Sequence, residues 1–457
     1  MKRSLSEDMI YSDKFDLCNN DFKLKLDKFL KDWKKYGAVS TPKEIVRFMI
    51  KISDIKNWEG LNILEPGCGF FDFSREIYCQ YPNNNFTGVE VNPEIYEIVT
   101  KLFPFRTILA DFLLWETTEK FDLIIGNPPY GILGFNRYPI KISKEIKEKY
   151  KYLYKTWKGK YNIYGLFIEK SLKHLKKGGK LVFIVPCTFM ILDEFSKLRE
   201  LLAKSGGIKI YYLGKNVFDK NVTTCVLIVT KDFQFRGNLE LYEVKDNLKN
   251  VVLWYAKKEY SGEIIKFENE DTKKFEEGKP KIQDLFDLHF AARSVEYYKN
   301  PKVSKEPKPG YVCVLKGNNL HPNWIDYENC YTGLWVPKES VGEFRWFYTI
   351  PRIVVGHTKG GKIVAAVDEK CYAWREEIHL VPKIALSIEE MREIAEYLNS
   401  DKMQWYVKTL YKDITPHTTI TQLKLLPLPE KYNKYLKSQK QILLKYENKN
   451  EQCIRLL

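Results

Sequence analysis

The chain has 457 residues, of which 44% are hydrophobic and 29% charged, and its formal net charge is +15. This composition is that of a folded globular protein and excludes a disordered or membrane class. Because a single core stops growing before this length, we expect two domains. The first twenty residues carry mixed charges, and no apolar run is long enough to span a bilayer. The sequence therefore predicts a cytoplasmic protein without a membrane partner.

The positive charge suits a polyanionic partner, because Lys and Arg release counterions from phosphate backbones. Charge alone leaves nucleic-acid binding undecided, since a lysine-rich composition also arises without a functional cause. The nine cysteines contain no Cys-x-x-Cys pair, so their spacing predicts neither a metal site nor a disulfide framework. We expect them to be small packing residues in a reducing compartment.

The first predicted element is an amphipathic helix over residues 22–36, part of an N-terminal helical extension over about residues 1–37. From Asn62 to about Thr230, short apolar runs alternate with longer amphipathic stretches. This alternation favours a largely parallel sheet flanked by helices. The last two strands are expected to form an antiparallel hairpin at the sheet edge. The predicted strands are 62–67, 85–91, a strand ending at 111, 121–129, 180–186, 208–214 and 223–231.

After Val251 the sequence changes to tryptophan- and tyrosine-rich segments broken by Gly and Pro, such as residues 310–335 and 351–374. This texture predicts a mixed, β-rich second domain, with one helix at about residues 387–410 near its end. We therefore predict a Rossmann-like α/β catalytic domain over residues 1–265, followed by a β-rich domain over residues 266–457.

A nucleoside-binding turn is predicted in the segment LEPGCG at residues 64–69, which follows a strand and opens a helix. Gly67 and Gly69 allow the backbone to approach a ligand closely. A dinucleotide fingerprint would place a third glycine at position 72, but Asp72 stands there, so no diphosphate needs the helix N-terminus. This difference favours S-adenosylmethionine, whose positively charged amino-acid end suits Glu65.

Two further acids follow successive strands. Glu90 ends the second strand, at the spacing expected for the acid that holds both ribose hydroxyls. Asp111 ends the third and is placed to accept from an adenine amine, while Phe112 stacks on the ring. A lone acid at a strand end is usually a turn or a cap, but three in order indicate a nucleoside site. Thr41, before Pro42, suits a helix cap and a cofactor contact equally well.

The sharpest chemical signal is Asn127-Pro128-Pro129-Tyr130, directly after a strand. An amine on a base is a poor nucleophile, because its lone pair is delocalised into the ring. If the Asn127 side-chain oxygen and the Pro128 carbonyl accept its hydrogens, the nitrogen becomes tetrahedral without a charged base. Two prolines stiffen the loop, and Tyr130 is suited to stacking on the target. A plain Asn-Pro turn is the alternative, but the position favours methyl transfer to a base that has left the duplex stack.

At these residues the chain resembles the gamma-class adenine-N6 DNA methyltransferases, in which the cofactor turn precedes the catalytic loop and a single target-recognition region follows. The resemblance covers about residues 36–429. It implies an S-adenosylmethionine-dependent methyltransferase domain followed by a DNA target-recognition domain. The segments that carry it are ILADFLLWE at 108–116, GNPPYGI at 126–132, TWKGKYN at 156–162, FAARS at 290–294, VVGHTKG at 354–360 and WREE at 374–377.

The same resemblance assigns roles to individual residues. Phe218 resembles the aromatic that sandwiches the flipped adenine, and joins the loop residues 127–130 as catalytic. Lys220 and Arg293 resemble residues that meet DNA, although the spacing departs by one residue, which leaves Lys220 and Asn221 as alternatives. Pro416 resembles the residue that enters the gap beside the orphaned thymine. The expected cofactor residues are Thr41, Glu65, Pro66, Gly67, Glu90, Asp111, Phe112, Asn127, Pro129 and Phe167.

The resemblance also implies a substrate and partners. It predicts methylation of adenine within TCGA in double-stranded DNA by a monomer, as the modification half of a type II restriction-modification system. The restriction endonuclease would act on the same site without a stable complex. Methylation of RNA or of protein glutamine through the same loop is one alternative, against which the large C-terminal domain argues. A DNA-binding protein with an inactive loop is the other, against which the intact Asn127 and Tyr130 argue.

Overall fold

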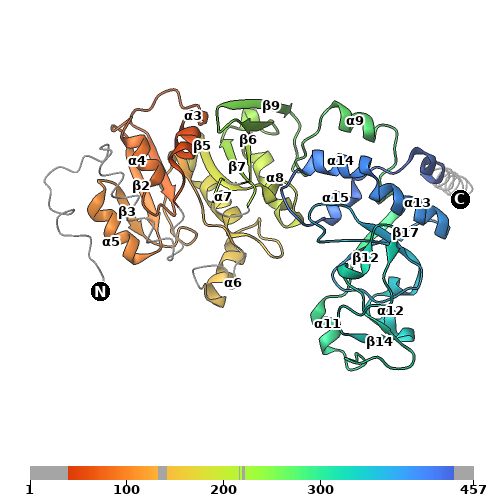
Figure 1. Cartoon of the computed structure of the whole chain (residues 1–457). Coiled ribbons are helices and arrows are strands. Elements are labelled where there is room, and N and C mark those ends of the chain that lie inside the picture. The colour runs from red at the N-terminus through yellow and green to blue at the C-terminus, as the bar shows by residue number, and fades with distance from the viewer. Residues whose placement is uncertain (1–39, 132–141, 216, 219–221, 437–457) are drawn as a thin grey trace, which may run out of the picture. The chain divides into compact units, whose positions relative to one another are not determined.

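The computed structural model describes residues 40–131, 142–215, 217–218 and 222–436 (Figure 1). The helix predicted over residues 22–36 lies outside these ranges, as do Lys220 and Asn221. The chain divides into two compact units, residues 1–265 and 266–457, which we call unit 1 and unit 2. Within the described ranges, no helix combines the length and apolar character that a membrane span requires.

Unit 1 contains one nine-stranded sheet in the order β3-β2-β1-β4-β5-β7-β6-β8-β9. Strands β1 to β5 pair in parallel, and the order reverses direction between β1 and β4. In open α/β sheets, ligands bind beyond the carboxyl ends of the strands at such a reversal. The Rossmann-like prediction is confirmed. The strands are β1 (Asn62–Pro66), β2 (Asn85–Glu90), β3 (Arg106–Leu109), β4 (Phe121–Gly126), β5 (Leu175–Pro186), β6 (Gly207–Gly214), β7 (Thr224–Thr230), β8 (Leu239–Lys245) and β9 (Asn250–Lys257).

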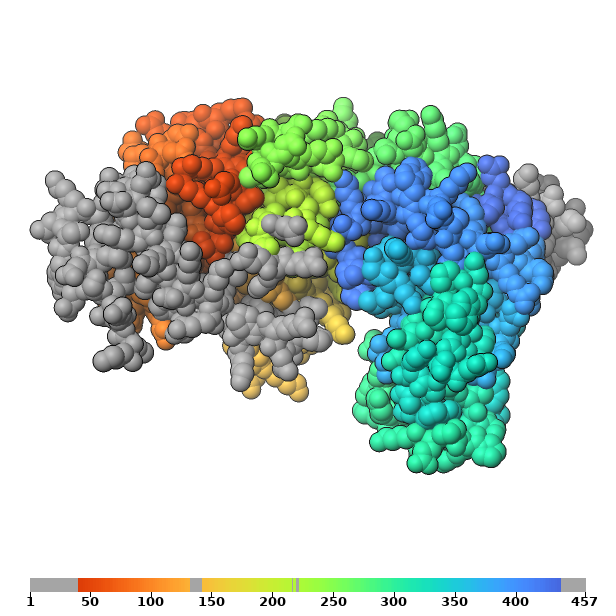
Figure 2. Space-filling view, in the orientation of Figure 1, coloured from red at the N-terminus to blue at the C-terminus, as the bar shows by residue number. Residues whose placement is uncertain are grey.

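The predicted hairpin of β6 and β7 is antiparallel, but its position at the sheet edge is wrong. Strand β7 pairs with β5, and β6 pairs in parallel with β8, so β8 and β9 extend the sheet. Residues 250–253 of β9 are exposed, and the strand lies at the surface of unit 1, green in Figure 2. Glutamates interrupt the apolar residues of β8, which obscured this strand in the sequence. Strand β9 contains an unbroken apolar run, VVLWYA, which the prediction did not assign to a strand, and it has no buried face.

Helices cover both faces of this sheet. Apolar residues of α3, α4 and α5 pack in one cluster with strand residues such as Ile63, Leu123 and Ile125. Their strand neighbours Leu64 and Ile124, which point to the opposite face, are also fully buried. Burial on both faces explains why the central strands are almost wholly apolar. The helices are α3 (Lys43–Ile52), α4 (Asp72–Tyr78), α5 (Pro93–Leu102), α6 (Lys144–Leu153), α7 (Ile163–His174) and α8 (Ser196–Ser205).

Unit 2 is a mixed domain, as predicted, although more of its described residues lie in α-helices than in strands. Its main sheet is antiparallel, in the order β10-β17-β15-β16, and two two-stranded sheets, β11-β14 and β12-β13, accompany it. The strands are β10 (Phe286–Phe290), β11 (Tyr311–Cys313), β12 (Leu320–His321), β13 (Trp324–Ile325), β14 (Trp335–Pro337), β15 (Arg352–Val355), β16 (Ala365–Asp368) and β17 (Ile378–Pro382). The helices are α9 (Glu270–Glu276), α10 (Ile282–Leu285), α11 (Ser294–Lys299), α12 (Val341–Phe344), α13 (Ile388–Asn399), α14 (Asp401–Tyr411) and α15 (Ile420–Lys424).

The single helix predicted at residues 387–410 is two helices, α13 and α14. The chain becomes extended at Ser400, whose hydroxyl accepts from the Met403 N–H and caps α14. Serine inside an apolar helical pattern gives little warning of a break, because it is tolerated within helices and favoured at their starts.

The expectation that the cysteines form no disulfide is also wrong. Cys313 in β11 is bonded to Cys330, with 5.5 Å between the two Cα atoms, and Cys79 is disulfide-bonded as well. Seventeen residues separate Cys313 from Cys330, so the pairing depends on tertiary approach and not on a local motif. Cys68, Cys187 and Cys225 are buried free thiols, as predicted.

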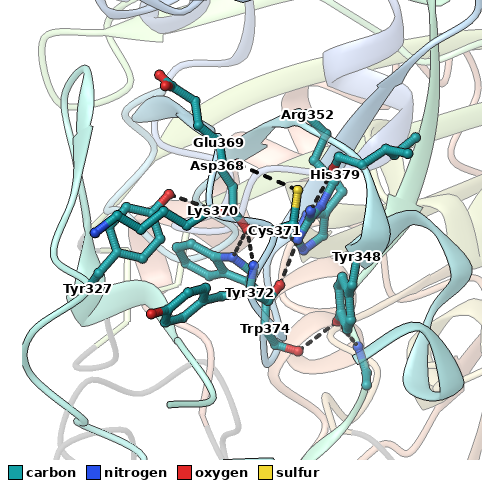
Figure 3. Close-up of polar contacts among 12 residues, drawn as sticks. Tyr327, Tyr348, Arg352, Asp368, Glu369, Lys370, Cys371, Tyr372, Trp374 and His379 are labelled. Carbon is teal, nitrogen blue, oxygen red and sulfur yellow. Dashed lines mark hydrogen bonds and ion pairs between the residues drawn. The ribbon is translucent and has the colours of Figure 1, made fainter. Parts of the chain in front are cut away.

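A buried polar network holds the centre of unit 2 together (Figure 3). Arg352 and Asp368 are both fully buried and form an ion pair at 2.9 Å. The Arg352 Nε donates to His379 Nδ1 at 2.9 Å, while Asp368 accepts from Trp374 Nε1 at 2.8 Å. The Trp374 carbonyl in turn accepts from the Tyr348 hydroxyl at 2.7 Å. These bonds fix strands β15, β16 and β17 to the segment that ends at Trp374.

We expect Asp368→Ala to lower the free energy of unfolding by roughly 3–5 kcal/mol, because Arg352 would remain buried without its carboxylate. Urea denaturation followed by tryptophan fluorescence measures the change. Arg392→Ala is the matched control, since Arg392 pairs with Glu369 at the surface and exposed pairs contribute little. Equal losses in the two variants would contradict the role given to the buried network.

Candidate active site

The predicted cofactor turn and the predicted catalytic loop leave adjacent strands at the same edge of the sheet. Strand β1 pairs with β4 at Ile63 with Leu123 and Leu64 with Ile124, so the residues after each strand meet. A Cβ added to Gly67 would lie 3.7 Å from the Phe167 ring and 3.9 Å from Pro129. Gly67 also has a φ of +66°, which favours glycine. The structure therefore brings Gly67, Pro129 and Phe167 together.

Glu65 lies at the end of β1, directly before Pro66 and Gly67, and only 3% of it is exposed. Its carboxyl accepts from the Ser74 N–H at 2.8 Å, the Ser74 hydroxyl at 2.7 Å and the Phe73 N–H at 3.3 Å. Burial raises the pKa of Glu65 to about 8. The Glu65 carboxyl thus anchors the start of α4. Its ionised form becomes more stable when a cation approaches.

Glu90 joins the two loops that flank the end of β2. Its Oε2 accepts from the Gly69 N–H at 2.9 Å, and its Oε1 accepts from the Asn92 N–H at 2.8 Å. Burial raises the pKa of this carboxyl above its ordinary value. Each oxygen keeps a second acceptor site, so Glu90 suits the two hydroxyls of a ribose.

Asp111 and Phe112 lie just beyond β3, and both contact other residues of unit 1. Asp111 accepts from the Leu113 N–H at 2.9 Å, and the Tyr150 hydroxyl donates to its other oxygen. Phe112 is 2% exposed and its ring centroid lies 5.0 Å from that of Phe167. Sequence reasoning did not find Tyr150, since a tyrosine on an amphipathic helix carries no signal of its partner.

The loop over residues 127–131 is anchored along its length. The Asn127 Nδ2 donates to Thr41 Oγ1 at 3.2 Å. The Asn127 Oδ1 has no hydrogen-bond partner among the described residues. The Tyr130 hydroxyl donates to the Ile184 carbonyl at 2.9 Å. The Gly131 N–H donates to Asn162 Oδ1 at 2.9 Å. Sequence reasoning missed the anchoring role of Asn162, although the residue lies in the quoted segment at 156–162.

Thr41 does not cap α3. The helix begins at Lys43, its N-cap position is Pro42, and it has no side-chain cap bond. The Thr41 hydroxyl instead contacts Asn127, and its N–H donates to Asp72 Oδ2 at 2.7 Å. The capping interpretation is therefore wrong, because the threonine hydroxyl faces the catalytic loop and orients its amide.

Phe218 lies beside Tyr130, with ring centroids 6.4 Å apart and ring planes at 76°. The two rings meet edge to face, and Phe218 is partly buried against the hydrophobic core of unit 1. The structure thus brings this predicted pair together, while the neighbouring Lys220 lies outside the described residues.

Arg293 and Pro416 are exposed in unit 2, close to one polar cavity of about 330 Å³. Residues 316–318, 357–359 and 375–377 line this cavity. Ala292, next to Arg293, forms a bridge with Arg375, and the Pro416 carbonyl accepts from the Gly361 N–H at 3.2 Å. Arg293 and Pro416, two of the residues predicted to contact DNA, therefore lie on segments that meet beside this cavity.

The Rossmann-like sheet, its glycine turn and the acids that follow its strands define an S-adenosylmethionine-dependent methyltransferase, so the predicted cofactor is confirmed. Residues 83–218 match the family model of the Eco57I restriction-modification methylase. Residues 312–428 match the model of the TaqI-like C-terminal specificity domain.

The chain is 46% identical over 403 residues to the type II methyltransferase M.TthHB8I of Thermus thermophilus, covering 87% of this chain and 92% of that protein. It is 30% identical over 215 residues to the modification methylase CviBIII of Paramecium bursaria Chlorella virus NC1A, covering 46% and 53%. A solved structure of the type ISP restriction-modification enzyme LlaBIII bound to DNA matches in fold with a TM-score of 0.52 and 12% identity, covering 86% and 38%. The chain belongs to the TaqI-like type II DNA methyltransferases.

We expect Glu90→Ala to weaken S-adenosylmethionine binding roughly 10- to 100-fold, because hydrogen bonds to a charged acceptor are lost. Isothermal titration calorimetry gives the dissociation constant. Glu94→Ala, at the exposed start of α5, is the control for charge and should leave affinity unchanged. A folded Glu90→Ala protein with wild-type affinity would remove Glu90 from the cofactor site.

Proposed function

We propose that this DNA methyltransferase methylates N6 of an adenine that is flipped out of the duplex. The observation that carries the proposal is the uncommitted Asn127 Oδ1, held beside the Gly67 turn by the bond from the same amide to Thr41. An acceptor that is fixed before the substrate arrives needs no reorganisation during the reaction.

The chain supplies acceptors and alignment, with no charged general base. Asn127 Oδ1 and the Pro128 carbonyl each accept one hydrogen of the amine, which returns its lone pair to the nitrogen. Bound S-adenosylmethionine would supply the methyl group from its positively charged sulfur and be left as a neutral thioether, and the methylated amine would release one of its hydrogens as a proton. The anchors at Tyr130 and Gly131 hold the loop, so the acceptors keep their direction and the nitrogen stays aligned with the donor.

Stacking on Tyr130 and Phe218 supports the flipped base. Extrusion costs a few kcal/mol of lost stacking and pairing, and contact with protein aromatics offsets part of this cost. The Tyr130 ring is fixed by the bond from its hydroxyl to the Ile184 carbonyl, and the Phe218 ring meets it edge to face.

The choice of adenine and of TCGA rests on the resemblance to the gamma class. The net charge of +15 and the exposed Arg293 and Pro416 beside the polar cavity are consistent with a duplex held by unit 2. On the same basis we propose a monomer that acts once on each strand of the palindrome. Its restriction endonuclease would act on that site separately.

Labelled S-adenosylmethionine offered with a TCGA duplex, with transfer RNA and with a glutamine-bearing protein tests this function. Digestion of the DNA to nucleosides should place the label on N6-methyladenine, and the treated DNA should resist an endonuclease that cuts TCGA. Label in RNA or protein alone would replace the proposed substrate.

We expect Asn127→Ala to lower the single-turnover rate roughly 100- to 1,000-fold, as for loss of one fixed stabilising group. Duplex affinity should stay at the wild-type value, because the change removes no cationic contact. Asn57→Ala, at an exposed position of unit 1, is the control for the same substitution. A wild-type rate in Asn127→Ala would eliminate the proposed hydrogen bond.

A further inference from the structure

The polar cavity of unit 2 contains donors and acceptors that the methyl-transfer chemistry does not use. Some of these groups already form hydrogen bonds within the cavity lining. Lys359 Nζ donates to the carbonyls of Gly317 at 2.5 Å and Leu320 at 3.0 Å. Glu377 is buried and accepts from the His357 N–H at 2.6 Å. These bonds tie the three lining loops together and give the cavity a fixed shape.

Two neighbouring side chains keep free hydrogen-bonding capacity. The Arg375 Nε is buried and has no hydrogen-bond partner within the described part of the chain. Its nearest carboxylate oxygen, on Glu376, is 3.9 Å away. Glu376 has a side chain that is 58% exposed and accepts one bond, from the Ser294 hydroxyl at 2.8 Å. The Arg375 guanidinium, whose Nε has no hydrogen bond, and the Glu376 carboxylate thus stand side by side at the cavity.

The backbone holds this pair in an unusual conformation. Glu376 has a φ of +69°, in the left-handed region that side chains rarely adopt. On one side, the Arg375 N–H donates to the Leu315 carbonyl at 2.8 Å, next to the buried Trp374 network. On the other, the Ala291 N–H donates to the Glu377 carbonyl at 2.8 Å. Hydrogen bonds on both sides of Glu376 therefore hold its backbone in this conformation.

The rim of the cavity contains the residues already expected to meet DNA. Ser294, which bonds Glu376, directly follows Arg293. Thr358 forms a hydrogen bond at 2.9 Å with the ring of His417, which directly follows Pro416. Arg293 and Pro416 are thus each followed by a residue that is bonded to the lining of the cavity.

We propose that this cavity reads one guanine–cytosine pair in the major groove, with Arg375 donating to guanine O6 and N7 and Glu376 accepting from the cytosine amine. Guanine exposes two acceptors there and cytosine one donor, which complements this pair of side chains. An adenine would direct its amine at a guanidinium that has no acceptor. The inference rests on the proposed function, in which duplex DNA is the substrate.

The test begins by sequencing plasmid DNA methylated by the wild-type protein, which identifies its motif. Affinities are then measured at fixed salt, with S-adenosylhomocysteine present, for the motif duplex and for duplexes with one pair replaced. Arg375→Ala should reduce discrimination at one guanine–cytosine position roughly 5- to 150-fold and leave the other positions unchanged. Glu376→Gln, at an exposed side chain, should relax selectivity at the same position without a folding defect.

Lys305→Ala, an exposed cation of unit 2 outside the cavity lining, is the matched control and should preserve selectivity. A uniform loss of affinity for every duplex in Arg375→Ala, with a salt slope reduced by about one, would identify a phosphate contact and overturn base reading. Unchanged selectivity in both cavity variants overturns it as well. A wild-type protein that methylates no duplex overturns the proposed function together with this inference.

Discussion

The account depends on one hydrogen bond, from the Asn127 amide to Thr41. It links the segment before α3 to the loop after β4, and it turns the amide so that an acceptor remains for the substrate. The bond can form because Thr41 is itself held by Asp72, at the start of the helix that follows the glycine turn. Thr41 therefore links the start of α4, after the glycine turn, to the loop over residues 127–131.

In unit 2, as in unit 1, polar contacts between distant segments hold the structure in place. Its buried Arg352–Asp368 pair is costly to desolvate, and further hydrogen bonds surround it. Its partners are His379, Trp374, Tyr327 and the carbonyls of Ile350 and Tyr372. The network ends at the residue before Arg375, where the polar cavity begins. In unit 1 a part-buried polar contact orders the loop over residues 127–131, and in unit 2 a buried polar network lies directly before the cavity.

The sheet and the cofactor turn were predictable because strong local signals coincide there: buried apolar strands, glycines and acids at strand ends. Strands β8 and β9, the break at Ser400 and the Cys313–Cys330 disulfide were not predicted. The disulfide depends on tertiary approach, and the Ser400 cap is a local bond that an apolar helical pattern hides. The same holds within the site. Asn127 was predictable because it lies in a recognisable sequence motif. The contacts of Thr41, Tyr150 and Asn162 are tertiary, and no sequence spacing predicts them.

The most direct measurement is a crystal structure with a duplex and a non-reactive analogue of S-adenosylmethionine bound together. The account predicts an extrahelical adenine whose amino nitrogen lies within hydrogen-bond distance, about 2.7–3.2 Å, of both Asn127 Oδ1 and the Pro128 carbonyl oxygen, and faces the donor sulfur. A loop directed away from that sulfur, or an amine bound by other groups, would contradict it.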